Sequence, residues 1–168
     1  MRLLAGMVGL WVAVLPSITH AACPQELAVY EADNGNLLEF SGNSNAEMGF
    51  HQIGLLLQAN DDQETPIILD AFVEKTHGLG QAEMIVRYGC PDGDIPLDDL
   101  DECTIYQSVV YGADNAGLIG ELPAAGKPAA ETIVLPNFTA DVWMHPAWKE
   151  ISGPKRPAEI FQLSGCME

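Results

Sequence analysis

The residue types most suited to binding a small molecule are concentrated between Trp143 and Trp148. This stretch reads Trp-Met-His-Pro-Ala-Trp and combines two indole rings, a thioether and an imidazole. Aromatic rings offer apolar contact area with a polar edge, and His145 adds a titratable donor and acceptor. We therefore predict a ligand-binding site at Trp143, His145 and Trp148. The same residue types at helical spacing are also typical of a protein core.

Thioether and imidazole groups are also copper ligands. Met144 and His145 lie in this stretch, and Met48 and His51 lie elsewhere in the chain. No Met-x-Met repeat accompanies them, and His51 falls on an apolar strand face, where a core histidine is the usual finding. We therefore predict no bound metal and no cofactor.

A second cluster is acidic and lies between Cys90 and Cys103. It would suit Ca²⁺, which takes about six to eight oxygen ligands, and its members are Asp92, Asp94, Asp98, Asp99, Asp101 and Glu102. The loop lacks the ligand spacing of a known calcium loop, and Pro96 interrupts it. We interpret it as a solvated acidic surface on a short helix, and whether it binds a cation stays open.

The common catalytic signatures are absent from the sequence. It contains no G-x-S-x-G, H-E-x-x-H, P-loop, dinucleotide-binding or C-x-x-C motif. A serine hydrolase site would have to assemble from distant positions, because catalytic triads are defined by geometry. Its members would be drawn from His51, His77 and His145, and from Ser41, Ser44, Ser108, Ser152 and Ser164. We predict a binding or accessory protein, with a small hydrolase as the alternative.

Net charge excludes one class of partner. The chain has 24 acidic and 7 basic residues and a formal net charge of −17, which repels phosphate backbones. We therefore predict no nucleic-acid binding, and expect a small molecule or an envelope protein as the partner. Lys149, Lys155 and Arg156 form a local basic cluster. It would either bind an anion or, as we prefer, neutralise nearby carboxylates.

The elements that must position these residues are mostly short strands. Polar and apolar alternation and β-branched runs predict strands at 27–31, 36–40, 50–58, 66–74, 82–88, 104–112, 118–122 and 159–163. Asp33-Asn34-Gly35 predicts a hairpin turn, and strands 50–58 and 66–74 are expected to be antiparallel neighbours. Short helices are predicted at 95–102, 129–135 and 137–148. The predicted fold is mainly β (α+β), an antiparallel sandwich or open barrel with a few short helices.

The four cysteines form an even set, which is typical of disulfides in an exported chain. Cys90 and Cys103 lie at the end of one predicted strand and the start of the next. Cys23 and Cys166 lie near the two ends of the mature chain, and domain termini commonly lie close together. We predict the pairs Cys90–Cys103 and Cys23–Cys166, since the other pairings would tie each terminus to the acidic loop.

The N-terminal residues predict export. Arg2 precedes an apolar run at 3–15, and Pro16, Ala21 and Ala22 follow, which is the pattern of a secretory signal peptide. We expect cleavage to remove residues 1–22 and to leave 23–168 as a single disulfide-bonded domain, periplasmic or secreted, with no transmembrane segment. Lipidation of Cys23 is the alternative, but His20 stands where lipoprotein signals usually carry Leu.

Overall fold

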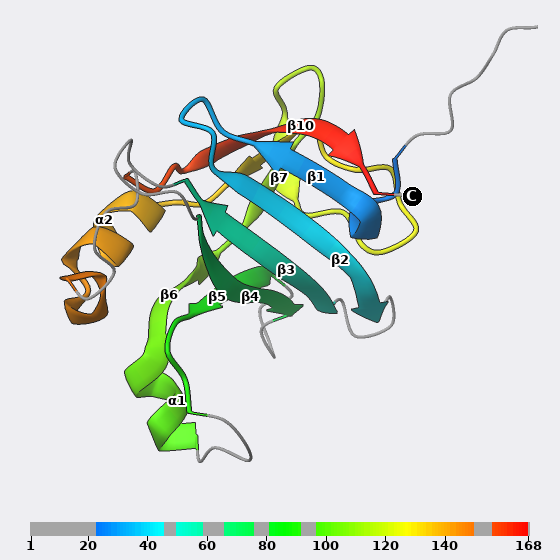
Figure 1. Cartoon of the computed structure of the whole chain (residues 1–168). Coiled ribbons are helices and arrows are strands. Elements are labelled where there is room, and N and C mark those ends of the chain that lie inside the picture. The colour runs from blue at the N-terminus through cyan, green and yellow to red at the C-terminus, as the bar shows by residue number, and fades with distance from the viewer. Residues whose placement is uncertain are drawn as a thin grey trace, which may run out of the picture.

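The computed structural model describes residues 23–45, 50–58, 66–75, 81–91, 97–149 and 156–167. Within these ranges, ten strands form one antiparallel sheet in the order β6-β5-β4-β3-β2-β1-β10-β9-β7-β8. Their bounds are β1 Ala28–Glu31, β2 Leu37–Asn45, β3 Phe50–Leu57, β4 Ile67–Lys75, β5 Ala82–Arg87, β6 Thr104–Val109, β7 Tyr111–Ala113, β8 Ile119–Glu121, β9 Thr132–Val134 and β10 Ile160–Cys166. The sheet curls into a half-barrel (Figure 1). The mainly β prediction is confirmed in its open-barrel form, because all the described strands belong to one sheet.

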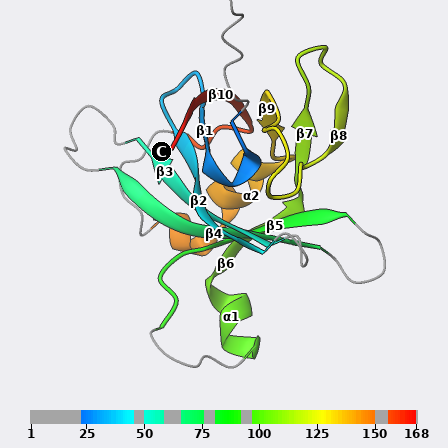
Figure 2. The ribbon, with the colours of Figure 1, turned by 90° about the vertical axis from the view of Figure 1, so that its right-hand side faces the viewer.

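One stretch of chain joins the two ends of this sheet. β6 pairs with β5 at one end, and β7 pairs with β8 and β9 at the other, yet only Val110 separates β6 from β7. The single strand predicted at 104–112 is therefore two strands that serve opposite ends of the sheet (Figure 2). The buried Val110 donates its N–H to the Ala82 carbonyl at 3.0 Å, which holds the bend against β5.

Alternating residues of the long strands point into the curl and form the core. β3 and β4 pair antiparallel as expected, with Leu55 opposite Leu69. The first hairpin turns at Asp33-Asn34-Gly35, where Gly35 has a φ of 82° that an L side chain rarely adopts. Burying this apolar surface is the main stabilising contribution of the fold, and its largest fully buried side chains include Tyr30, Leu38, Phe40, Leu55, Leu69, Met84, Phe138 and Phe161.

Two α-helices, both short, lie within the described ranges, and α2 contributes the buried Phe138 and Val142 to the core. α1 spans Leu97–Cys103 and overlaps the helix predicted at 95–102, of which residues 95 and 96 lie outside the described residues. α2 spans Phe138–Met144 and packs on β6, with the Phe138 and Tyr106 rings edge-to-face at 4.9 Å. In the segment 137–148 the sequence predicts one or two helical turns before Pro146 interrupts, and α2 confirms this, because the helix ends before Pro146, which begins the 3₁₀ turn Pro146–Lys149. In the described part of the chain, no helix is long and apolar enough to cross a membrane.

The helix predicted at 129–135 is wrong. Residues 132–134 form β9, which pairs antiparallel with both β7 and β10. Thr132, Ile133 and Val134 are all β-branched and favour the pleated backbone. Pairing on both sides of β9 outweighs the helical start signal that Pro128 gives in the sequence.

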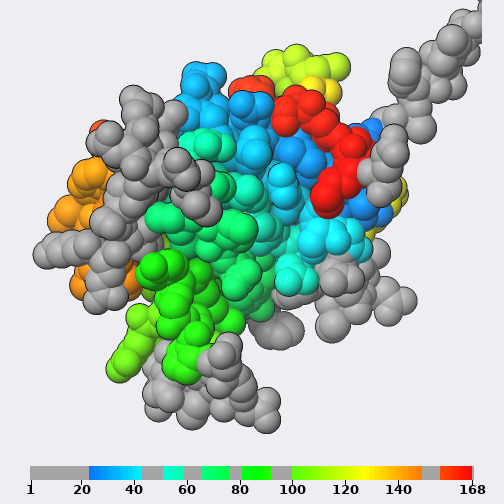
Figure 3. All heavy atoms as spheres, viewed as in Figure 1, coloured from blue at the N-terminus to red at the C-terminus, as the bar shows by residue number. Residues whose placement is uncertain are grey.

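The two ends of the described chain lie side by side (Figure 1). β10, longer than the strand predicted at 159–163, pairs with β1 so that Ala28 lies opposite Cys166. Cys23 is bonded to Cys166 and Cys90 to Cys103, which is the pairing favoured from the sequence. In the space-filling view, β1 to β4 occupy the middle of the outer face and α2 lies at its flank (Figure 3).

Candidate functional site

The predicted aromatic site is only partly open to a ligand. Trp143 and Trp148 contact each other with ring centroids 5.8 Å apart, but Trp148 is buried and Trp143 is 50% exposed. His145 does not join the two indoles. It borders a separate, shallow depression between α2 and β6 together with Asp141, and its Nδ1 accepts the N–H of Ala147 at 3.2 Å. The structure brings the two tryptophans together, and ligand binding at the three residues stays a prediction.

Neither described histidine has a serine partner. His51 Nε2 lies 3.2 Å from the Pro123 carbonyl oxygen, and His145 bonds within its own turn. Among the described serines, Ser41 and Ser164 donate to backbone carbonyls. His77, Ser152 and the side chain of Ser44 lie outside the described residues.

The acidic and basic clusters are described only in part. Residues 92–96 of the acidic loop and residue 155 lie outside the described residues. Within the described ranges, no three His, Cys, Asp or Glu side chains converge as metal ligands. Arg156 is exposed, and its backbone carbonyl accepts a hydrogen bond from the Asn34 side chain at 2.7 Å. That contact ties the turn before β2 to the chain leading into β10.

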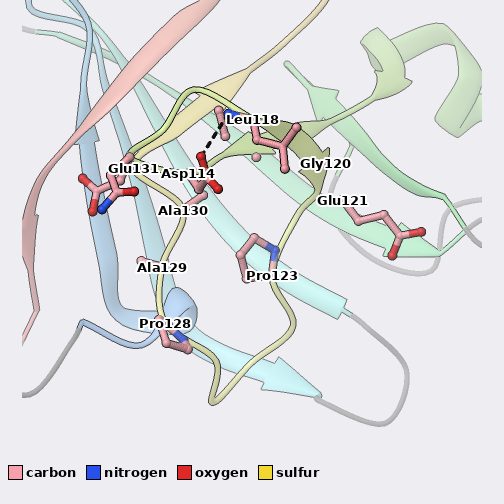
Figure 4. Close-up of a pocket in the computed structure, with 12 residues that line it drawn as sticks. Asp114, Leu118, Gly120, Glu121, Pro123, Pro128, Ala129, Ala130 and Glu131 are labelled. Atoms are coloured by element: carbon pink, nitrogen blue, oxygen red, sulfur yellow. Dashed lines mark hydrogen bonds between the residues drawn. The ribbon is translucent and has the colours of Figure 1, made fainter.

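A cleft that the sequence did not predict opens beside the β7–β8 hairpin. We call it the hairpin cleft: a hollow of about 360 Å³ between the hairpin and residues 123–131. Pro123, Pro128, Ala129 and Ala130 give it apolar walls, and Leu118 lies at the hairpin tip (Figure 4). The cleft is open to solvent along the hairpin and can take a small molecule or a side chain.

Two facing glycines border the hairpin cleft. Gly112 of β7 and Gly120 of β8 are register partners and both line it. A Cβ on Gly112 would lie 3.0 Å from the Ala130 Cβ and 3.3 Å from the Pro123 Cδ, whereas a Cβ on Gly120 would meet nothing within 4 Å. Glycine at 112 therefore lets the wall approach the hairpin, and glycine at 120 leaves free space beside it.

The wall at residues 127–130 is fastened to the N-terminal segment. Gln25 is fully buried; its backbone N–H donates to the Lys127 carbonyl, and its Oε1 accepts the Ala130 N–H at 3.0 Å. The Gln25 Nε2 donates to the Tyr30 hydroxyl, which in turn donates to the Ala130 carbonyl at 3.0 Å. Burial raises the pKa of Tyr30, so this hydroxyl stays protonated and available as a donor.

The charged residues that line the hairpin cleft are all acidic. They are Asp114, Glu121 and Glu131, while Lys127 lies in the wall segment but is not one of the described lining residues. The carboxylates of Glu121 and Glu131 lie on opposite sides and point away from each other (Figure 4). One carboxylate oxygen of Asp114 already has partners within the turn, because Oδ1 accepts the N–H groups of Ala116 and Leu118. Separated carboxylates around an apolar hollow suit an extended cationic ligand better than a single metal ion.

His51 lies behind the same wall and holds Pro123. It is 2% exposed, its ring is edge-to-face with Phe40 at 5.2 Å, and its Nδ1 is buried with no hydrogen-bond partner. Because the Pro123 carbonyl is an acceptor, Nε2 carries the proton of the neutral ring. Burial lowers the pKa of His51 below the ordinary value of 6.5, and the Pro123 carbonyl and Glu26 offset this only in part.

This histidine should make stability depend on pH. In the unfolded chain His51 takes up a proton at a higher pH than in the folded protein, so stability is full above about pH 6.5 and falls as the pH drops toward the lower folded pKa. We therefore expect the free energy of unfolding, measured by urea unfolding, to fall less between about pH 7.5 and about pH 5 in His51→Gln than in the wild type. An equal loss in both proteins would contradict this role for His51.

No protein-family model, curated protein or solved structure matches the chain. The hairpin turns at Asp114-Asn115-Ala116-Gly117, between the strands predicted at 104–112 and 118–122. The sequence did not predict the contact of this hairpin with residues 128–131, because the helix predicted at 129–135 took the place of the cleft wall. The sequence signal that could have indicated the cleft is the pair of glycines, Gly112 and Gly120, since glycine inside a strand often marks a close approach by another segment or a ligand.

Proposed function

We propose that the protein is an exported binding protein, periplasmic or secreted, that holds a cationic ligand in the hairpin cleft. The observation that carries this proposal is an apolar hollow whose described lining residues include three acids and no base. An acidic surface raises the local concentration of cations. An apolar hollow rewards a ligand that also carries a hydrocarbon part.

Export is supported by the cysteine chemistry and the N-terminal pattern. Two disulfides join all four cysteines, and disulfides persist in oxidising compartments. When the full chain is expressed in an export-competent bacterium, the protein released by osmotic shock should have the intact mass of a chain that begins at Ala22 or Cys23. Recovery in the membrane fraction with an added acyl mass would show lipidation of Cys23 instead.

Binding can be tested with a small cation of known shape. Isothermal titration calorimetry with cadaverine, a five-carbon diamine, should show binding that weakens as salt rises, while the matched diacid glutarate should not bind. Gly120→Val should reduce the affinity about tenfold or more, because its side chain enters space in which a Cβ meets nothing within 4 Å. The unfolding midpoint of this variant should stay close to that of the wild type.

Matched charge variants separate the cleft from the general acidity of the chain. Glu131→Gln removes a carboxylate from the cleft, and Glu74→Gln removes an exposed one from β4. Only the first should weaken cadaverine binding measurably. If Trp143→Ala abolishes binding while Gly120→Val leaves it intact, the ligand site is the aromatic surface of α2 and the cleft assignment is wrong.

A further inference from the structure

β8 is the last strand of the sheet and has one edge without a partner among the described residues. It pairs with β7 alone, at the end of the strand order. Figure 2 shows the β7–β8 hairpin standing away from the curled sheet, with β8 outermost. An open strand edge carries unpaired N–H and C=O groups, and these are a template for another strand.

The register shows which backbone groups face that edge. Asp114 donates its N–H to the Leu118 carbonyl at 3.2 Å, so these two residues form a hydrogen-bonded pair. Antiparallel ladders alternate, so Gly112 and Gly120 bond to each other, while Ile119 and Glu121 turn their N–H and C=O outward. The carbonyl of Ala113, opposite Ile119, accepts the Glu131 N–H on the far side of β7, as this alternation requires.

The hairpin is held in shape before any partner arrives. The Asp114 Oδ1 accepts the N–H groups of Ala116 and Leu118, each at 2.9 Å, and its carbonyl accepts the N–H of Gly117. Gly117 has a φ of 77°, which closes the turn without strain. A binding element that is already ordered loses little conformational entropy when it binds.

The side chains at this edge define the chemistry of a partner. Leu118 and Ile119 are 73% and 60% exposed, and Asp114 and Glu121 flank them. β8 is short and carries the charged Glu121, but it has neither Lys nor Pro, so the one charge on this edge repels an acidic strand and attracts a basic one. Leu118 and Ile119 are consecutive and face opposite sides of the strand, with Asp114 opposite Leu118 and Glu121 on the side of Ile119. An incoming strand that alternates apolar and basic residues would place its basic side chains on the cleft side, near Asp114, and its apolar side chains on the other side, against Ile119. A second copy of this chain is disfavoured as the partner, because two chains of net charge −17 repel each other.

We propose that the free edge of β8 binds an extended cationic segment of another exported polypeptide by strand addition, with a basic side chain of that segment in the hairpin cleft. This inference rests on the proposed function and names the ligand class of the same site. Hydrogen bonds to Ile119 and Glu121 supply the pairing, and the carboxylates around the cleft select a basic strand over an acidic one.

The test uses a defined probe, an acetylated and amidated heptapeptide of alternating Lys and Val. It should bind with higher affinity than cadaverine, and a Glu and Val peptide should not bind. A third peptide keeps every Lys but replaces the central Val with Pro, which removes a strand donor at unchanged charge. We expect this peptide to bind with an affinity at least about tenfold lower than that of the Lys and Val peptide.

Hydrogen exchange on the wild-type protein reports the pairing itself. Bound peptide should slow exchange of the Ile119 and Glu121 amides and leave that of Gly120, already bonded to β7, unchanged. Ile119→Pro removes one outward N–H and should weaken peptide binding while cadaverine binding persists. If this variant is unstable, hydrogen exchange on the wild-type protein still tests strand pairing.

Four results would overturn strand addition. Equal affinity for the Val and Pro peptides, with no change at Ile119 and Glu121, means attraction of charge alone and leaves the proposed function intact. Cadaverine binding without peptide binding has the same consequence. Protection of those amides that rises with protein concentration and without peptide identifies a second copy as the occupant. Failure of both cadaverine and peptide to bind overturns the proposed function as well.

Discussion

Removing the disulfide between Cys23 and Cys166 by serine substitution at both positions should lower the free energy of unfolding by about 5 kcal/mol. The bond closes a loop with a sequence separation of 143. In the chain-entropy model, a cross-link lowers the conformational entropy of the unfolded chain, and it lowers it more when the loop is longer. The Cys23 carbonyl also accepts the Ala129 N–H at 2.8 Å. Loss of the bond should therefore loosen one wall of the hairpin cleft and weaken cadaverine binding.

The second disulfide provides the matched control. Serine at Cys90 and Cys103 opens a loop with a separation of only 13 and should cost about 3 kcal/mol, without altering the cleft. Urea unfolding of the three proteins under non-reducing conditions measures the difference. Equal losses, or a larger loss from the short loop, would contradict this ranking. Peptide mapping without reductant should recover Cys23 linked to Cys166.

Gln25→Met should destabilise the protein by about 3 kcal/mol. Methionine keeps the length of the side chain but removes the hydrogen bonds to Tyr30 and to the Ala130 N–H, and it leaves that buried N–H without an acceptor. A lost neutral hydrogen bond costs about 1 kcal/mol, and a stranded buried donor costs about 1–3 kcal/mol. Because Ala130 borders the hairpin cleft, the variant should also bind cadaverine more weakly.

An exposed glutamine in a similar hydrogen bond is the control for this substitution. Gln162 accepts the Thr132 hydroxyl at 3.0 Å on the outside of the sheet. Water replaces that partner when it is lost, so Gln162→Met should change the free energy of unfolding by no more than about 0.5 kcal/mol. If the two variants lose similar amounts of unfolding free energy, the buried hydrogen bonds of Gln25 stabilise the protein no more than the exposed one of Gln162.

Local patterns predicted the sheet wherever neighbouring strands pair. The Asn34-Gly35 turn and the alternation in 50–58 and 66–74 were sufficient for β1 to β4, because each of these strands pairs with the next along the chain. β9 was missed because its partners, β7 and β10, lie far from it in sequence. Pairing of that kind is a tertiary effect, and it outweighs the local preference of a short segment.

The candidate site was harder to predict than the fold. Trp143 and Trp148 have the composition of a binding site, and the structure uses Trp148 largely for packing. The hairpin cleft has ordinary composition, and it arises because Gly112 admits Ala130 and Pro123 at close range. Nothing in the sequence distinguishes Gln25, which hydrogen-bonds to that wall, from an exposed glutamine, because its burial is visible only in the structure. Spatial convergence, rather than residue type, marks these positions.

The pairing of the first strand with the last sets an order on biogenesis. A ribosome delivers β1 early, yet the partner of Ala28 is Cys166, so this edge of β1 stays unpaired until residues 160–166 have been added. β2 to β6 form from neighbours along the chain and need no such delay. Cys90 and Cys103 can thus meet before residue 166 has been added, while the thiol of Cys23 has no partner until then. The Cys23–Cys166 disulfide can form only on chains that extend to residue 166, and a chain that stops short of it would leave the first strand and the Cys23 thiol without their partners.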